Sequence, residues 1–146
     1  LGYARRFNKQ IKNIKPKLRK QGIEWTDWME KVVLYYYYPE KLDNVPNWIK
    51  KLAEILVGCE KLEANCNRMR GNDYYNRENE SFFDAFKYLD NLKNENCISK
   101  KVLFEIQRLV AKGLFDDILR EARDGYISEE ELKFLRTINT EDNKCQ

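Results

Sequence analysis

Apolar residues recur at spacings of three and four along one long stretch, residues 46–69 (PNWIKKLAEILVGCEKLEANCNRM). This spacing places them on one face of an α-helix, which has about 3.6 residues per turn. The face comprises Trp48, Leu52, Ile55, Cys59, Leu62, Cys66 and Met69. Pro46 at the start and Gly71 after the end are typical of helix boundaries. The pattern predicts a central helix that buries this face.

Shorter stretches with the same period predict further helices. They cover residues 3–20, 26–37, 82–92, 99–112, 114–123 and 128–137. Pro16 lies inside the first, and we expect it to kink or divide that helix near Ile14. Only six Gly and three Pro are present, too few for the many turns of an all-β fold. We predict an all-α fold: a compact bundle of six or seven helices around the central one, in a single domain over residues 1–146.

Serines mark three of these helix starts, because a serine side chain accepts a hydrogen bond from a backbone N–H in the first turn. They are Ser81, Ser99 and Ser128. The sequence Ser128-Glu-Glu-Glu131 also has the spacing of a capping box.

Charge is concentrated at the N-terminal end. The net charge is +3, yet residues 1–20 contain eight basic residues and no acid, so the remainder sums to about −5. This helix is either the first member of the bundle, with a solvated basic face, or a site for a partner or polyanion through Arg5, Arg6, Lys9 and Lys12. No aromatic or Arg/Gly interleaving accompanies the charges, so we expect no nucleic-acid partner.

Aromatic residues cluster in the next helix, in the segments WTDW and YYYY. Trp25, Trp28, Tyr37 and Tyr38 are candidates for an aromatic contact patch, because Trp and Tyr dominate binding hot spots. Alternatively the rings pack in the core while the tyrosine hydroxyls reach solvent. Four consecutive tyrosines cannot all face inward on a helix, so one or two should be exposed.

Catalytic and cofactor motifs are missing. The chain has no histidine, and we find no phosphate-binding loop. The ending DGYISEEELKFL is similar to half of an EF-hand, but Arg120 and Ala122 occupy the first two ligand positions and cannot bind calcium. We therefore expect no enzyme activity, metal or cofactor. No apolar run approaches the roughly 18 residues of a membrane span.

Four cysteines carry the most informative chemistry. Cys59 and Cys66 lie about 10 Å apart along one helix, too far for a mutual disulfide, which leaves two of three pairings. In an antiparallel hairpin Cys97 returns to the level of Cys59, so we predict Cys59–Cys97, with Cys66–Cys145 holding the tail. The alternatives are free thiols in a reducing compartment or, less favoured without CxxC or histidine, zinc. Asn79 begins a glycosylation sequon, which matters if the chain is secreted.

With its helices and the cysteines Cys59, Cys66, Cys97 and Cys145, the chain resembles the small secreted salivary proteins of blood-feeding flies. The similar families are the neutrophil-stimulating and the complement- or platelet-directed proteins of mosquitoes. The resemblance implies a secreted, non-enzymatic protein that binds a host immune or haemostatic component or a cell-surface receptor. The cysteine spacing differs from the six-cysteine odorant-binding pattern, which argues against a small-ligand cavity. Two other hypotheses are an intracellular helical adaptor of degenerate EF-hand type and a polyanion binder acting through the basic helix.

Overall fold

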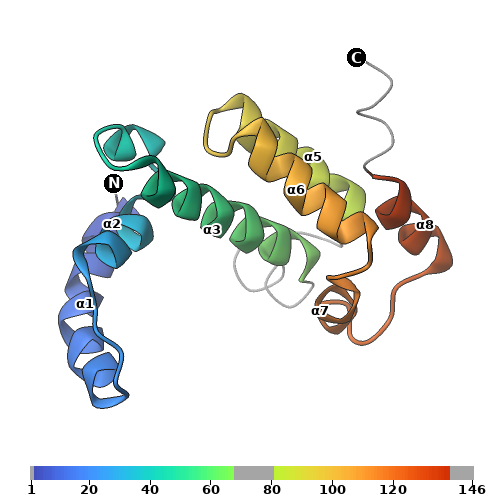
Figure 1. Cartoon of the computed structure of the whole chain (residues 1–146). Helices are drawn as coiled ribbons and strands as arrows, with labels where there is room; N and C mark the ends of the chain where they lie inside the picture. The colour runs from blue at the N-terminus through green and yellow to red at the C-terminus, as the bar shows by residue number, and fades with distance from the viewer. Residues whose placement is uncertain (1, 68–80, 139–146) are drawn as a thin grey trace. The chain divides into compact units, whose positions relative to one another are not determined.

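The computed structural model describes residues 2–67 and 81–138, and every regular element within those ranges is a helix (Figure 1). The all-α fold class is therefore confirmed. The elements are α1 (Gly2–Lys20), α2 (Asp27–Tyr35), the 3-10 helix η1 (Pro39–Leu42), α3 (Asn47–Cys66), α5 (Phe82–Asn94), α6 (Lys100–Ala111), α7 (Asp116–Glu121) and α8 (Glu129–Thr137).

The chain divides into two compact units, residues 1–56 (unit 1) and residues 57–146 (unit 2). The boundary falls within α3, whose residues belong partly to each unit. The single domain expected from the sequence stays a prediction.

In unit 1, α1 and α2 lie side by side (Figure 1). Ile11 of α1 and Leu34 of α2 are buried against each other, and the half-buried rings of Trp25, Tyr35 and Tyr38 pack around them. Of the two outcomes predicted at Pro16, a kink or a division, the division is wrong, because α1 continues through Pro16 to Lys20, and the kink stays a prediction. A proline inside a helix removes one backbone hydrogen bond, and packing of Ile11 on α2 offsets part of that loss.

The four tyrosines lie across the end of α2 rather than on one helix. The helix stops at Tyr35, and a tight turn follows in which the Tyr38 N–H donates to the Tyr35 carbonyl at 2.7 Å. Tyr36 is buried, while Tyr35, Tyr37 and Tyr38 are half-buried. The expectation that one or two would be exposed is wrong, because the turn frees the rings from helical spacing.

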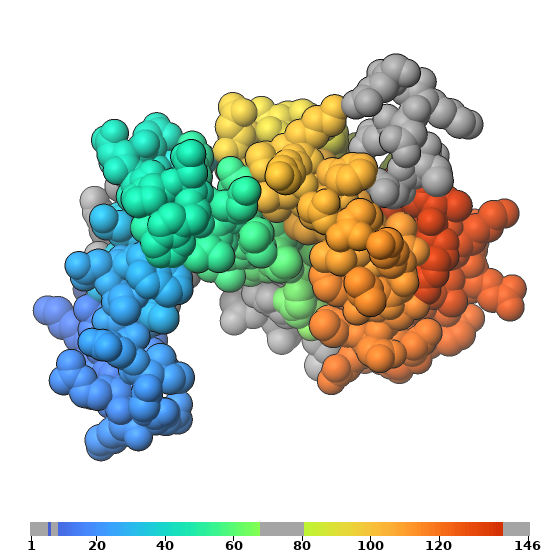
Figure 2. Space-filling model, in the orientation of Figure 1, coloured from blue at the N-terminus to red at the C-terminus, as the bar shows by residue number. Residues whose placement is uncertain are grey.

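In unit 2, α5 and α6 run side by side (Figure 1), and α8 packs against α6 (Figure 2). Their inner faces are apolar, and several side chains are almost completely buried. These are Phe82, Leu89, Ile98, Val110 and Leu135. The predicted starts of these helices are confirmed: Ser81, Ser99 and Ser128 each accept a backbone N–H from the residue three positions later. The capping box of Ser128 and Glu131 is also formed.

Two arginines attach α8 and its preceding loop to the rest of unit 2. Arg136 forms a bidentate pair with Asp116, one bond measuring 3.1 Å, and also donates to the Val110 carbonyl at 3.3 Å. The hydrogen bonds to Asp116 raise the pKa of Arg136. Arg123, which is buried, lies 3.8 Å from Glu131. The contacts of Arg136 join residues 20 and 26 positions apart, so they fix where the last helix lies within this unit.

The part of α3 in unit 2 approaches α6 closely at Gly58. A Cβ atom at this glycine would lie 2.8 Å from Cδ1 of Ile106 and 4.0 Å from Cγ2 of Ile98. The first distance is shorter than ordinary carbon contacts, so the absence of a side chain allows this approach.

Candidate interaction surfaces

The part of α3 in unit 1 exposes a contiguous set of apolar side chains. Trp48 is 51% exposed, and Leu52, Ile55 and Leu56 are 36–43% exposed. Their spacing of four, three and one residues places them on one face, about 12 Å long. We call these four residues the apolar row. Ile49 and Ala53 on the adjacent face are buried, so unit 1 packs on a different face from the row.

This arrangement corrects the prediction of one continuous buried face on the central helix. Leu62 and Cys66, in the second half of α3, are buried as expected. Trp48, Leu52 and Ile55, in the first half, are exposed. Met69 and Gly71 lie outside the described residues. The sequence did indicate this exposure. Apolar residues at 48, 49, 52, 53, 55, 56 and 57 surround much of the helix. One packing face cannot bury all of them, so some must remain exposed.

Trp48 is held in place by an aromatic neighbour. Its ring meets the ring of Trp28 edge-on, with centroids 5.5 Å apart and an interplanar angle of 66°. An aromatic anchor with aliphatic neighbours is the composition found in the centre of protein–protein interfaces.

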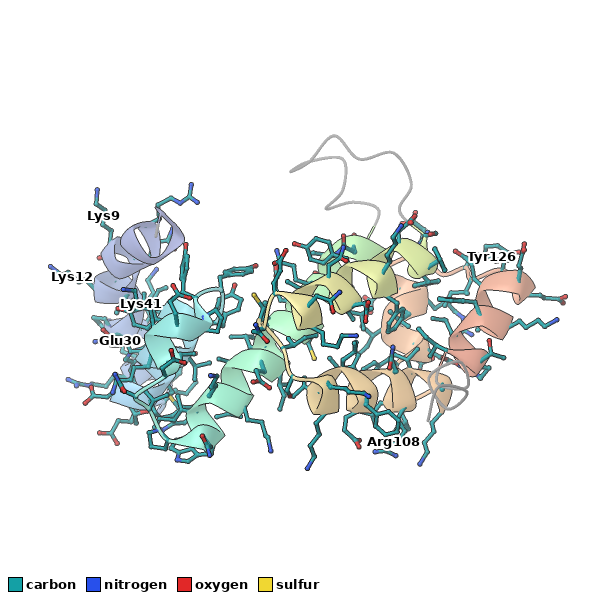
Figure 3. The ribbon with its side chains drawn as sticks, turned by 90° about the horizontal axis from the view of Figure 1, so that it is seen from above. Lys9, Lys12, Glu30, Lys41, Arg108 and Tyr126 are labelled. Atoms are coloured by element: carbon teal, nitrogen blue, oxygen red, sulfur yellow. The ribbon has the colours of Figure 1, made fainter. Side chains whose placement is uncertain are left out.

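The basic residues predicted to bind a partner or polyanion are solvent-facing where described. Arg6, Lys9 and Lys12 are exposed, and Figure 3 shows Lys9 and Lys12 extending away from the ribbon of α1. The side chain of Arg5 lies outside the described residues. Lys15 differs from these, since its Nζ lies 2.7 Å from Oε2 of Glu30.

The predicted aromatic patch is half-buried rather than open. Trp25, Trp28, Tyr37 and Tyr38 are all of intermediate exposure. Trp25 Nε1 donates to Glu30 Oε2 at 3.1 Å, and Tyr38 packs on the small core of unit 1. Each ring is thus partly buried within the protein. A role in partner contact stays a prediction for these four residues.

No disulfide joins any two of the described cysteines, so the predicted Cys59–Cys97 bridge is not formed. Cys59 instead lines a pocket of about 230 Å³, together with Leu62, Glu63, Phe115, Ile118 and Leu119. Although much of the residue is accessible, these neighbours partly desolvate the thiol and raise the pKa of Cys59. Cys145 and the sequon residue Asn79 lie outside the described residues.

Within residues 2–67 and 81–138, no group of three or more Cys, Asp or Glu side chains could hold a metal ion. Among the described helices, none is both long enough and apolar enough to cross a bilayer.

Comparison with known protein-family models, curated proteins and solved structures gave no match. The resemblance to salivary proteins therefore stays a prediction.

Proposed function

We propose that this chain is a secreted, non-enzymatic protein that binds a host immune or haemostatic component and changes the activity of that component. The observation that carries the binding part of the proposal is the apolar row of α3. The nature of the partner rests on the resemblance of the helical, four-cysteine chain to salivary proteins of blood-feeding flies.

The apolar row supports binding because its exposure is unfavourable in water. Fully burying one exposed Leu, Ile or similar side chain contributes roughly 1.5–3 kcal/mol. The four side chains of the row are 36–51% exposed, so about half of that free energy per residue is available to a partner. Trp48 is well suited as the centre of such a contact, since Trp is enriched among the residues that dominate binding. Its edge-on contact with Trp28 restricts the ring before binding and so lowers the entropy cost of association.

The extracellular part of the proposal has its own test at the cysteines. We propose that Cys66 pairs with Cys145, which would anchor the C-terminal tail, while Cys59 remains a thiol as in the structure. Intact mass of the natively expressed chain, with and without reductant, followed by peptide mapping, measures this directly. A loss of two hydrogens with a Cys66–Cys145 peptide is the expected result. Four thiols in the native protein would instead favour the intracellular adaptor.

The binding proposal is tested with a double variant of the row, Trp48→Ala with Leu52→Ala. The wild-type chain is added to blood plasma, platelets and neutrophils, and clotting, aggregation, complement lysis and chemotaxis are measured against its concentration. We expect at least one of these responses to change. The double variant should need roughly tenfold more protein for the same effect, because loss of one contact of about 1.4 kcal/mol changes affinity tenfold.

A matched control is available in unit 2. Leu114 is 65% exposed and Tyr126 is 71% exposed, so Leu114→Ala with Tyr126→Ala removes one aliphatic and one aromatic side chain, both more exposed than Trp48 and Leu52. This variant should retain the wild-type response. Circular dichroism establishes that both variants are folded. The absence of any response to the wild-type chain, or full activity of the row variant, contradicts the proposal.

A further inference from the structure

The helix α1 presents a basic surface along most of its described length. At about 100° per residue, Lys9, Lys12, Pro16, Arg19 and Lys20 fall within an arc of about 100°, over roughly 17 Å of helix. Each of them is exposed. No acidic residue occurs anywhere in residues 1–20, so nothing on α1 itself neutralises this surface. We call these five residues the basic face.

The opposite side of α1 is already occupied. Ile11 is 3% exposed and packs against Leu34 of α2, and Leu18 on the same side is half-buried. An amphipathic helix binds a bilayer by inserting its apolar side, and here that side forms the core of unit 1. The geometry therefore disfavours a lipid membrane as the partner.

The charges of the basic face are not balanced by the rest of the described chain. Of the described contacts of α1, the one ion pair joins Lys15 to Glu30 at 2.7 Å, while Lys9, Lys12 and Arg19 have no such pair with the described residues. Like charges three or four residues apart on a helix repel each other, as at Lys9 and Lys12. A bound polyanion would relieve that repulsion, so binding should also stabilise the helix.

A shallow hollow lies at the C-terminal end of the basic face. It has a volume of about 450 Å³ and is lined by Lys15, Pro16, Arg19 and Lys20. Three cationic side chains thus surround one concave space large enough for an anionic group and part of the unit that carries it.

We infer that the basic face of α1 binds a linear sulfated polysaccharide, a function additional to the protein contact proposed for α3. Such a chain carries repeated anionic groups and hydroxyls and has no bases. Single-stranded nucleic acids bind through aromatic rings that stack on bases, whereas Trp25, Tyr35 and Tyr38 pack around Ile11 and Leu34 on the other side of α1. A sulfated polysaccharide has no bases to stack, so it is suited to a surface that offers positive charge without stacking aromatic rings.

The test compares two triple variants of the full chain that change the net charge equally. The first is Lys9→Glu, Lys12→Glu and Arg19→Glu on the basic face. The control is Lys100→Glu, Lys101→Glu and Lys133→Glu, which are exposed residues of unit 2. Affinity for heparin is measured by calorimetry at several salt concentrations. The first variant should bind at least tenfold more weakly than the wild type, and the control should stay within about threefold.

Two further measurements separate a site from general attraction. For nucleic acids, each ion contact contributes about 0.7–0.9 to the steepness with which log affinity falls against log salt. With three contacts removed, this slope should be less steep by about 2 in the first variant than in the wild type. Heparin should also raise the unfolding temperature of the wild type and of the control. If charge reversal disturbs folding, judged by tryptophan fluorescence, the substitutions Lys9→Gln, Lys12→Gln and Arg19→Gln take its place with the same expected weakening.

The outcomes are decisive in both directions. Equal weakening in the two triple variants would mean that net charge alone drives binding, and would overturn the inferred site. Tighter binding to single-stranded RNA of equal charge, or to anionic phospholipid vesicles, than to heparin would overturn the assignment to a polysaccharide. Because the row variant of α3 leaves the basic face intact, it should bind heparin normally, so failure of either proposal is distinguishable from failure of the other.

Discussion

The Glu30 carboxylate joins α1, α2 and the loop between them. Its Oε2 accepts from Lys15 of α1 at 2.7 Å and from Trp25 Nε1 at 3.1 Å. The hydrogen bond from Lys15 lowers the pKa of Glu30, and the Trp25 hydrogen bond and the charge of Lys15 lower it further, against partial burial, which raises it. The charged form of this carboxylate is thus favoured in the folded chain.

A pH dependence follows from that direction. Since the pKa of Glu30 is lower in the folded state, the unfolded state binds the proton more readily, and Glu30 stabilises the fold above its ordinary carboxyl pKa. The contribution is lost as the pH falls through the lowered pKa. For a partly exposed pair we expect about 0.2–1 kcal/mol at pH 7. The measurement is urea unfolding of the wild type and Glu30→Gln, from pH 7 to pH 3, by tryptophan fluorescence.

All three tryptophans, Trp25, Trp28 and Trp48, belong to unit 1, so the fluorescence reports the unit that contains Glu30. The difference between the wild type and Glu30→Gln should shrink toward zero at low pH. A difference that stays constant from pH 7 to pH 3 would show that the glutamate acts through packing rather than through its charge.

At the scale of single residues, the features that sequence predicted best are the local ones. Ser81, Ser99 and Ser128 cap helices as expected, because a cap depends on a side chain and on backbone within three residues. The Cys59–Cys97 pairing depended on long-range geometry and is wrong. The predicted position of this contact along α3 was nearly right, since Gly58, the neighbour of Cys59, lies beside Ile98, the neighbour of Cys97. One residue further, the helix has turned by about 100°, and Cys59 faces the pocket with Phe115.

At the scale of helices, periodicity predicted where the helices lie but not which face is buried. The predicted stretches 82–92 and 99–112 correspond closely to α5 (Phe82–Asn94) and α6 (Lys100–Ala111). For α3 the choice of face was wrong in the first half, because apolar residues occupy two faces there and periodicity cannot rank them. Which face is buried depends on the partners that tertiary packing supplies, and these are distant in sequence.

The two candidate surfaces also differ in whether they depend on local sequence or on tertiary packing. The basic face could be predicted from sequence, because a cluster of like charges is solvated whatever the packing. The apolar row could not, because exposure of Trp48 contradicts the usual burial of apolar residues on a helix. The row is exposed because unit 1 buries Ile49 and Ala53 on the adjacent face of α3 instead.

At the scale of the whole molecule, the two units differ in charge and in core size. Unit 1 has 12 basic and 6 acidic residues, a net charge of about +6, whereas unit 2 has 15 and 18, about −3. Of the described core residues, seven belong to unit 1 and sixteen to unit 2. Since apolar burial is the main favourable term in folding, unit 1 should be the less stable of the two.

Hydrogen exchange measures this difference. Amides of α1 and α2 should exchange faster than those of α5 and α6, because local opening costs less where the buried apolar surface is small. Exchange followed by mass spectrometry of peptides from each helix gives the comparison within one sample. Equal protection of the four helices would contradict the expected order and would indicate that the chain opens as one cooperative body. Heparin, if bound as inferred, should slow exchange in α1 specifically.

The close approach of α3 and α6 at Gly58 has a consequence for how related chains can be recognised. A side chain at position 58 would meet Ile106 unless the residue at position 106 were shorter. In any group of chains that share this packing, the two positions should therefore vary together: glycine opposite a long aliphatic residue, or alanine opposite a shorter one. This paired pattern, combined with serines at the starts of the following helices, is a signature of the fold that does not depend on overall sequence identity.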